Sequence, residues 1–197
     1  WDEATLPHKR SAERYEARLW GDGKPAEEAR EYLRSVRGFR EDTLRHFQVG
    51  LARRGKCVPC GDVTSLADGD VCPKCKSVVE RAWEMIALPY IDHSRVVNFK
   101  FRGVAEKRFE RWTDAPSWLF GIDTLANQHE RVVIAEGEFD AMSFWQLGYP
   151  SVVSPGGAAC ELHDACVEAL APFDEVMLAY DNDDAGEKHQ RLVVAML

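Results

Sequence analysis

The chain has 197 residues, of which 45% are hydrophobic and 29% are charged. This length is enough for one domain of ordinary size or two small ones, and the composition excludes a wholly disordered or collagen-like chain. No run approaches the roughly 18 consecutive apolar residues of a membrane span, so no contact with a membrane is expected. The chain begins with Trp1 and no apolar leader follows, so no secretory signal is expected either.

Acidic and basic residues are unevenly distributed along the chain. Lys and Arg number 25 and Asp and Glu 33, which gives a net charge of −8. Residues 1–112 hold 22 basic and 18 acidic groups, whereas residues 113–197 hold 3 and 15, so the two parts carry net charges of +4 and −12. Such asymmetry favours a nucleic acid or another charged partner. A drift of surface charge along the chain is the alternative explanation.

The first quarter of the chain predicts helices. Residues 1–20 predict one charged helix. Pro25 suits the first position of a second helix, whose apolar residues recur at helical spacing until Gly38 ends it. A further short helix is predicted around residues 39–47, packing on the second. We interpret these helices as a source of core packing without chemistry of their own.

Four of the six cysteines form two C-x2-C pairs separated by 11 residues: Cys57, Cys60, Cys72 and Cys75. In a chain without a secretory signal, such pairs predict metal ligands before disulfides. Two such C-x2-C turns brought together make the tetrahedral all-sulfur site that zinc prefers. Because four protein ligands leave no open position on the metal, the predicted role of the site is folding or presentation of a surface. The other two cysteines, Cys160 and Cys166, are predicted to be ordinary core residues.

A basic rim surrounds this cysteine module, formed by Arg53, Arg54, Lys56, Lys74 and Lys76. The rim favours contact with nucleic acid, although a solvated surface would have the same composition.

Two strands are predicted after the cysteines, at residues 85–90 and 95–102. In the second, Val97, Phe99 and Phe101 alternate with polar and basic residues, which predicts a half-buried strand with a basic outward face. Residues 95–111 hold six basic and two acidic groups, a balance that suits a strip facing phosphate. An exposed strand and loop of ordinary charge is the alternative.

The last third predicts strands alternating with helices. Strands are expected at residues 132–137, 151–154 and 176–181, and helices around 141–147, around 161–170 and from 184 onward. This alternation predicts a parallel sheet covered on both faces.

Acidic residues follow two of these strands. Glu136-Gly137-Glu138-x-Asp140 comes after the first and Asp181-x-Asp183 after the third. The carboxyl ends of parallel strands meet at one edge, where the gathered carboxylates would repel one another unless a hard divalent cation relieved the repulsion. Each motif alone is common in solvated loops. Their shared position directly after apolar strands predicts a metal site.

These motifs resemble a known signature. AEGEFDAM followed by LAYDNDDAG is similar to the Toprim motif of primases, type IA and II topoisomerases, RecR-type repair proteins and some nucleases. The resemblance implies Mg²⁺-dependent chemistry on phosphodiester bonds, but it does not indicate which reaction is catalysed.

The preceding segments resemble one of these families more closely. EYLRSVRGFREDTLRHFQVGLA, RVVNFKFR and KRFERWTDAPSWLFGIDTL are similar to the RNA polymerase domain of bacterial DnaG-type primases and bacteriophage primase–helicases. The resemblance covers roughly residues 26–54 and 86–191. It implies an α/β fold, with a Toprim-type parallel sheet flanked by helices and preceded by a smaller α+β subdomain that carries an inserted zinc ribbon.

The resemblance also implies a division of the chain into four parts. These are a helical N-terminal part of the primase core at 1–54, a zinc-ribbon insertion at 55–77, a basic strand and loop subdomain at 78–128, and a C-terminally truncated Toprim domain at 129–197. In the familiar primases the zinc module precedes the polymerase domain, whereas here it lies inside it. Recognition of a template sequence is therefore not carried over to this module.

The implied function is that of a DNA primase in DNA replication. Such a nucleotidyltransferase, a DNA-directed RNA polymerase, makes short RNA primers on single-stranded DNA from ribonucleoside triphosphates, with catalytic Mg²⁺ or Mn²⁺ and, here, structural Zn²⁺. A replicative helicase is the implied partner in a primosome, in the cytoplasm of a bacterial or bacteriophage-infected cell.

Site residues follow from the same resemblance. Glu136, Asp181 and Asp183 match its metal-binding carboxylates, and Asp140 matches the second acidic position of the first motif. The positions expected to hold nucleotide phosphates or template are Lys100, Arg102, Lys107 and Arg108.

Two other functions share these motifs. A RecR-like repair protein would bind DNA through a zinc unit and a Toprim domain without catalysis. Against it, about 56 residues separate Cys75 from the Toprim strand and the full acidic set is present. A Toprim nuclease would share the metal site but cut strands. A topoisomerase would need a catalytic tyrosine from another domain, and this chain offers no persuasive candidate.

Overall fold

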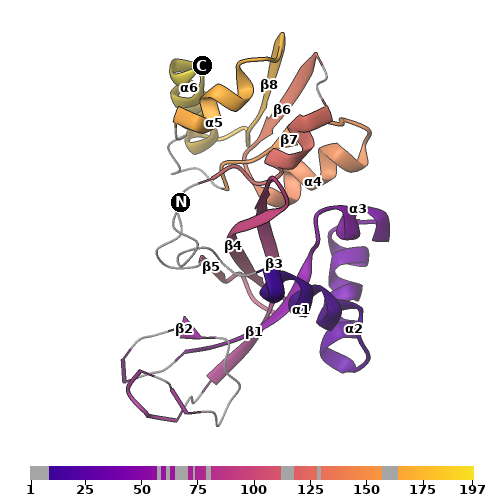
Figure 1. Ribbon diagram of the computed structural model, residues 1–197, viewed down its shortest axis with the longest axis vertical. Helices are drawn as coiled ribbons and strands as arrows, with labels where there is room; N and C mark the ends of the chain where they lie inside the picture. The colour runs from indigo at the N-terminus through magenta and orange to yellow at the C-terminus, as the bar shows by residue number, and fades with distance from the viewer. Residues whose placement is uncertain are drawn as a thin grey trace.

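The computed structural model describes residues 9–56, 59–60, 63–64, 71–72, 74–78, 81–111, 118–127, 130–156 and 164–197. These residues form two sheets, one antiparallel and one parallel, with helices packed around them (Figure 1). The helices are α1 Lys9–Trp20, α2 Lys24–Glu31, the π-helix η2 Tyr32–Val36, α3 Glu41–His46, the 3-10 helix η3 Ile122–Asn127, α4 Glu138–Gln146, α5 Asp164–Leu170 and α6 Asp184–Met196. The strands are β1 Gly50–Lys56, β2 Val63–Thr64, β3 Arg81–Asp92, β4 Arg95–Gly103, β5 Phe109–Arg111, β6 Arg131–Ala135, β7 Val152–Val153 and β8 Glu175–Ala179.

The predicted N-terminal helices are present. Pro25 lies in the first turn of α2, and Gly38 ends the helical segment with φ of 73°, a conformation that favours glycine. Between them α2 passes into the π-helix η2. Such wide turns are rare and often lie at functional sites.

The antiparallel sheet has the strand order β2-β1-β3-β4-β5. Strand β1 was not expected, because residues 50–54 fall in the part predicted to be helical. Its sequence lacks a clear alternation of apolar and polar residues, and pairing along its whole length with β3 makes it a strand. Tertiary pairing therefore decides the conformation of this segment.

The basic face of β4 is not outward, contrary to the prediction. The side chains alternate from Asn98 to Arg102, but the polar side faces η2 and the start of α4, and Asn98 is buried. The predicted alternation is wrong at Val97, which lies next to a register shift in the ladder and packs in a different apolar cluster from Phe99 and Phe101. Phe99 and Phe101 point to the other side, where Tyr15 of α1 packs against both rings. Both faces of the strand are covered, because α1 lies on one and Tyr32 of η2 and Glu138 of α4 contact the other.

The parallel sheet has the order β7-β6-β8, as the alternation of strands and helices predicted. Figure 1 shows α4 on one side of this sheet and α5 and α6 on the other. One apolar core joins it to the antiparallel sheet, including Leu88 of β3, Phe120 and Ile134 of β6. The two halves are therefore packed as one body. Cys166 of α5 is buried, as predicted for a core residue, whereas Cys160 lies outside the described residues.

In the described part of the chain, no helix is long and apolar enough to cross a membrane.

Candidate functional site

The loops after β6 and β8 bring the two acidic motifs together. The backbone N–H of Glu136 donates to the carbonyl oxygen of Ala179 at 3.1 Å. The backbone N–H of Asp181 in turn donates to Oε2 of Glu136 at 3.1 Å. Because β6 and β8 are parallel neighbours, both motifs leave the sheet at the same edge. The Glu136 side chain therefore reaches across to the loop that carries Asp181 and Asp183.

Asp140 and Asp183 each lie at the N-terminal end of a helix. Oδ2 of Asp140 accepts the backbone N–H of Gly137 at 3.2 Å, at the start of α4, and Oδ1 of Asp183 accepts that of Gly186 at 2.8 Å, as the N-cap of α6. A Cβ on Gly186 would overlap the carbonyl oxygen of Asp181, so the glycine lets α6 start directly against the acidic loop. Both carboxylates are held by local bonds and remain exposed.

Negative charge is concentrated at this edge. Desolvation, followed by the charge of Asp181, raises the pKa of Asp140, and Glu136 adds to the effect while the Gly137 N–H opposes it. Burial, with a smaller contribution from Glu136, also raises the pKa of Tyr180 to about 12. Glu136, Asp140 and Asp181 therefore act on one another electrostatically.

This donor set fits a hard cation in an open site. No three carboxylates among the residues described have oxygens that all lie within 4.8 Å of one another. Mg²⁺ keeps several waters and is commonly held by one or two carboxylates together with substrate phosphates, so it does not require a closed cage of side chains. The metal-ligand roles of Glu136, Asp181 and Asp183 stay predictions.

The raised pKa of Asp140 gives a pH-dependent prediction. Asp140→Asn keeps an oxygen for the Gly137 N–H but removes the charge. An acid whose pKa is higher in the folded state loses its stabilising contribution as pH rises through that pKa. The difference in melting temperature, variant minus wild type, should therefore increase as the pH is raised from about 4, near the ordinary pKa of Asp, toward pH 7. The measurement is made without added divalent cation. Circular dichroism melts at several pH values measure this increase. A difference that does not change with pH would contradict the prediction.

Of the predicted basic positions, Lys100 points into the protein. Its ammonium group donates to Oε2 of Glu138 and to the carbonyl oxygen of Gly156, both at 2.8 Å. The side chains of Lys100 and Glu138 are only 12% and 6% exposed. This lysine bridges β4 and the start of α4.

Arg102 lies two residues further on the same face and shares its surroundings with Arg37, a residue that the sequence did not single out. Both arginines donate from Nε to the hydroxyl of Tyr32, at 2.9 Å and 2.8 Å. Both guanidinium groups also lie over the ring of Phe139, at 5.3 Å and 5.2 Å. In the part of the chain that the structure describes, neither has a carboxylate partner.

The ring that the arginine pair (Arg37 and Arg102) shares belongs to Phe139 of α4, the residue directly before Asp140 in the chain. Two half-buried guanidinium groups without a carboxylate offer donors to an anion with several oxygens, such as a phosphate. The π-helix η2 carries Tyr32, which holds both groups.

The two remaining basic positions lie in the loop before β5. Lys107 is exposed. The Nε of Arg108 donates to Oε1 of Glu110 at 2.7 Å, and its guanidinium group stacks over Trp83 at 3.7 Å. Lys107 is therefore the more accessible of the two.

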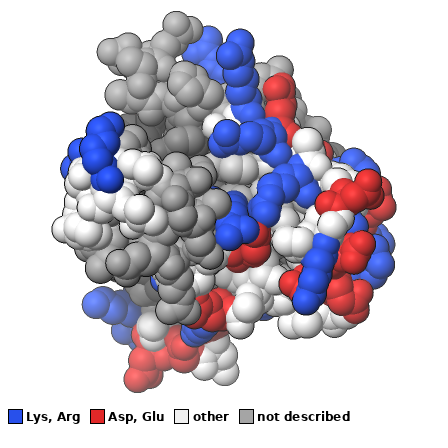
Figure 2. Space-filling view, turned by 90° about the horizontal axis from the view of Figure 1, so that it is seen from below, with Lys and Arg blue, Asp and Glu red and all other residues white. Residues whose placement is uncertain are grey.

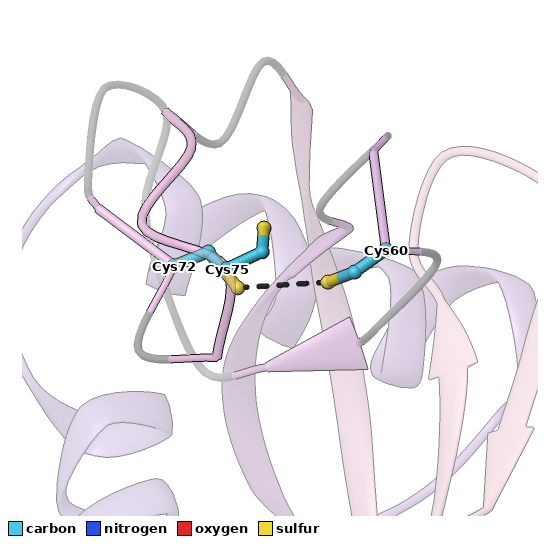
Figure 3. A group of neighbouring side chains, drawn as sticks. All are labelled: Cys60, Cys72 and Cys75. Atoms are coloured by element: carbon cyan, nitrogen blue, oxygen red, sulfur yellow. Dashed lines mark hydrogen bonds between the residues drawn. The ribbon is translucent and has the colours of Figure 1, made fainter.

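Three of the four predicted zinc ligands lie together (Figure 3). The sulfur atoms of Cys60, Cys72 and Cys75 are all within 4.8 Å of one another, and those of Cys60 and Cys72 are 3.7 Å apart. Four sulfurs at the usual Zn–S distance would be separated by about 3.8 Å. Cys57 lies outside the described residues. The three thiols therefore fit a zinc ion.

The second cysteine pair sits on a tight turn. The N–H of Cys72 donates to the carbonyl oxygen of Ser77 at 2.8 Å, and the N–H of Lys76 donates to that of Cys72 at 2.9 Å. Lys76 adopts φ of 63° to close this turn. The backbone thus directs Cys72 and Cys75 to one side, as a zinc knuckle requires.

The basic rim of the cysteine module is partly neutralised. Figure 2, which views the molecule from the module's end, shows Lys and Arg in a band with acidic groups beside it. Arg54 is buried and pairs with Glu110 at 3.2 Å, and Arg53 lies 3.7 Å from Glu84. Lys74 and Lys76 are exposed. The rim therefore offers less free positive charge than its sequence indicates.

Comparisons with known proteins agree with this architecture. Residues 133–197 match a family model described as Toprim-like. The chain is 26% identical over 190 residues to a DNA primase of Aquifex aeolicus and 28% identical over 180 residues to one of Thermotoga maritima, which covers 86% and 82% of it. Its fold is similar to that of a DnaG primase catalytic domain bound to single-stranded DNA, with a TM-score of 0.68 at 20% identity over 95% of this chain and 63% of that one.

The chain spans 38% and 32% of the length of these two curated relatives. The matches confirm the resemblance to Toprim-containing primases of the DnaG type, and with it the predicted fold class.

Proposed function

We propose that this chain, which has the fold of the catalytic core of DnaG-type primases, synthesises short RNA primers on single-stranded DNA. The observation that carries the proposal is the meeting of the two acidic motifs at one edge of the sheet, where the Asp181 N–H donates to Glu136. The arginine pair, on the ring of Phe139 in the same helix as Asp140, adds guanidinium groups that suit phosphates to carboxylates that suit a divalent cation, and transfer of a nucleotide requires both kinds of group.

The reaction joins two ribonucleotides. The 3′-hydroxyl of one attacks the α-phosphorus of a ribonucleoside triphosphate, a phosphodiester bond forms, pyrophosphate leaves with the electrons of the broken bond, and the hydroxyl proton passes to solvent. Glu136, Asp181 and Asp183 would hold Mg²⁺ or Mn²⁺, which supplies positive charge near the reacting oxygens when bound. The bond from the Asp181 N–H fixes the direction of the Glu136 carboxylate before substrate arrives. Asp140 adds negative charge to the same edge.

The phosphates and the template would meet the basic side of the site. Arg37 and Arg102 offer guanidinium donors toward the triphosphate, while Lys107 and Arg108 extend the positive charge along the loop before β5. Positioning and electrostatics would account for most of the acceleration, because phosphoryl groups carry their charge on several oxygens at once.

The proposal includes the cellular setting. Primer synthesis takes place in the cytoplasm of a bacterial or phage-infected cell, and a replicative helicase is the proposed partner in the primosome. The four-part division of the chain is also proposed, except that 1–54 and 78–128 act as one unit, since β1 and β3 pair along the same sheet. The cysteine module between them would hold structural Zn²⁺.

One assay tests the proposal against its rivals. The protein is incubated with single-stranded DNA, labelled ribonucleoside triphosphates and Mg²⁺ or Mn²⁺. We expect short RNA products that depend on the template. Binding of DNA without RNA synthesis would favour a RecR-like repair protein, and shortening of end-labelled DNA would favour a Toprim nuclease; either result contradicts the proposal.

A further inference from the structure

A buried polar cluster joins the antiparallel sheet to the start of α4. Lys100 of β4 and Tyr90 of β3 each contact one oxygen of the Glu138 carboxylate. The distances are 2.8 Å from the Lys100 ammonium to Oε2 and 2.5 Å from the Tyr90 hydroxyl to Oε1. Glu138 is the first residue of α4 and is separated from Glu136 by Gly137 alone. The cluster thus holds the loop that carries a predicted metal ligand.

The same lysine also holds the loop after β7. The carbonyl oxygen of Gly156 accepts from the Lys100 ammonium at 2.8 Å and from Nη2 of Arg111 at 2.7 Å. The Gly156 N–H donates to the hydroxyl of Ser154 at 2.9 Å, and that hydroxyl donates to the carbonyl oxygen of Glu136 at 3.0 Å. A continuous path of bonds therefore runs from Lys100 to the backbone of Glu136.

The fit between this loop and the cluster is tight. Gly156 has φ of 81°, which favours glycine. A Cβ at this position would overlap the hydroxyl of Tyr90 and lie 2.9 Å from Oε1 of Glu138. The backbone of the loop therefore approaches the buried side chains as closely as a residue without a side chain allows.

The surroundings of Lys100 argue against direct contact with phosphate. A buried charge held by a buried counter-charge is costly to separate, because the remaining partner is left uncompensated in a poorly solvated place. Arg102, on the same face of β4, has no such partner in the part of the chain described here. Two neighbouring basic residues on one strand therefore have different surroundings.

We propose that Lys100 and Glu138 are positioning residues, which anchor the loops around Glu136 to the antiparallel sheet so that the carboxylates at the sheet edge keep the arrangement that binds the divalent cation. The inference rests on the proposed function. It changes the role predicted for Lys100 from contact with phosphate to support of the metal ligands, as residues bonded to ligands do in other metal sites.

The test uses the full chain and five variants. Lys100→Met and Glu138→Gln each break the pair, and the double variant Lys100→Met/Glu138→Gln leaves no uncompensated charge. Arg102→Met represents loss of a direct phosphate contact. Arg131→Met is the matched control, because Arg131 pairs with Glu175 at 2.6 Å in an exposed position at the opposite end of the same parallel sheet.

The melting temperature and three further measurements distinguish the roles. Electron paramagnetic resonance of free Mn²⁺ gives the affinity for the cation without any need for activity. Hydrogen exchange reports the protection of residues 131–140 and 152–156. The slope of DNA affinity against salt concentration reports contacts with phosphate.

We expect both single variants and the double variant to bind Mn²⁺ about 10-fold or more weakly, as removal of such supporting groups does elsewhere. Exchange in the two loops should be faster, and the salt slope should stay at the wild-type value. The double variant should melt closer to the wild type than either single variant while its Mn²⁺ affinity stays low, which separates positioning from folding. Arg102→Met should lower the salt slope by about 1 with Mn²⁺ affinity unchanged, and Arg131→Met should change neither.

Three results would each overturn the inference. The first is Mn²⁺ affinity in the double variant equal to that of the wild type, and the second is no Mn²⁺ binding by the wild type. The third is a salt slope lowered by about 1 in Lys100→Met, which would make this lysine a phosphate contact. If the wild type binds Mn²⁺ and the variants bind it weakly, but no RNA is made, the proposed function fails while the positioning role stands.

Discussion

An Asp181→Asn variant is expected to lose primer synthesis by at least about 10²-fold, because removal of a charge that stabilises the transition state has an effect of this size in other enzymes. The fold should remain intact, since the backbone N–H of Asp181, not its side chain, donates to Glu136. Asn has nearly the same shape as Asp but lacks the negative charge that a divalent cation requires. The rate of RNA formation at saturating Mg²⁺ and the melting temperature together measure the effect.

Asp174→Asn is the matched control for this variant. Asp174 is also an exposed carboxylate and lies directly before β8, whereas Asp181 follows the strand. A surface change of this kind should leave the rate within about twofold of the wild type. Near-normal synthesis by Asp181→Asn would contradict the assignment of the metal to this edge of the sheet.

Replacement of Cys72 by Ser is expected to release the zinc ion and unfold the cysteine module. Structural Zn²⁺ contributes apparent free energies of about 10–16 kcal/mol in small zinc-binding peptides, so loss of a buried thiolate ligand should remove most of the module's stability. The effect should stay local, because the two sheets share an apolar core that does not depend on the module. The zinc content should fall from one ion per chain to none. The rate of hydrogen exchange should rise at residues 53–56 and 81–84 but not at residues 131–135.

Cys166→Ala is the control for the zinc experiment. Cys166 is buried in α5, within the apolar core. This variant should keep one zinc ion per chain even where its melting temperature falls. A wild-type protein without zinc would show that the three neighbouring thiols serve another purpose.

The parallel half of the fold could be predicted from local sequence. Each of its strands is a short apolar run ended by Gly, Asp or Pro, and α4 and α6 begin within a few residues of those that end β6 and β8. Strand β1 could not be predicted in this way, because the segment from Gly50 to Lys56 becomes a strand only through its partner β3. The face of β4 was misjudged for a similar reason. Alternation identifies which side chains share a face but does not say what covers that face.

The candidate site was predictable where its residues directly follow predicted parallel strands. The acidic motifs gather because parallel strands end at one edge, a rule that applies to any sheet of this kind. Arg37 was missed because it stands alone before Gly38 in a helix interpreted as core. Its significance comes from contacts with Tyr32 and Phe139, and only the folded chain brings Phe139 to it. The pairing of Glu138 with Lys100 likewise joins two segments whose proximity no local pattern reveals.

The place where the cysteine module joins the antiparallel sheet has a consequence for how such proteins can change. The chain leaves β1 at Lys56 and enters β3 at Arg81, and these two residues face each other in the ladder. Residues 57–80 therefore start and finish at the same point in space, and the pairing of the short edge strand β2 with the end of β1 is their contact with the ladder among the residues described. A short reverse turn or a foreign domain could be grafted there without shifting the register of the two strands, which makes this junction a natural exchange point for recombination and for engineering.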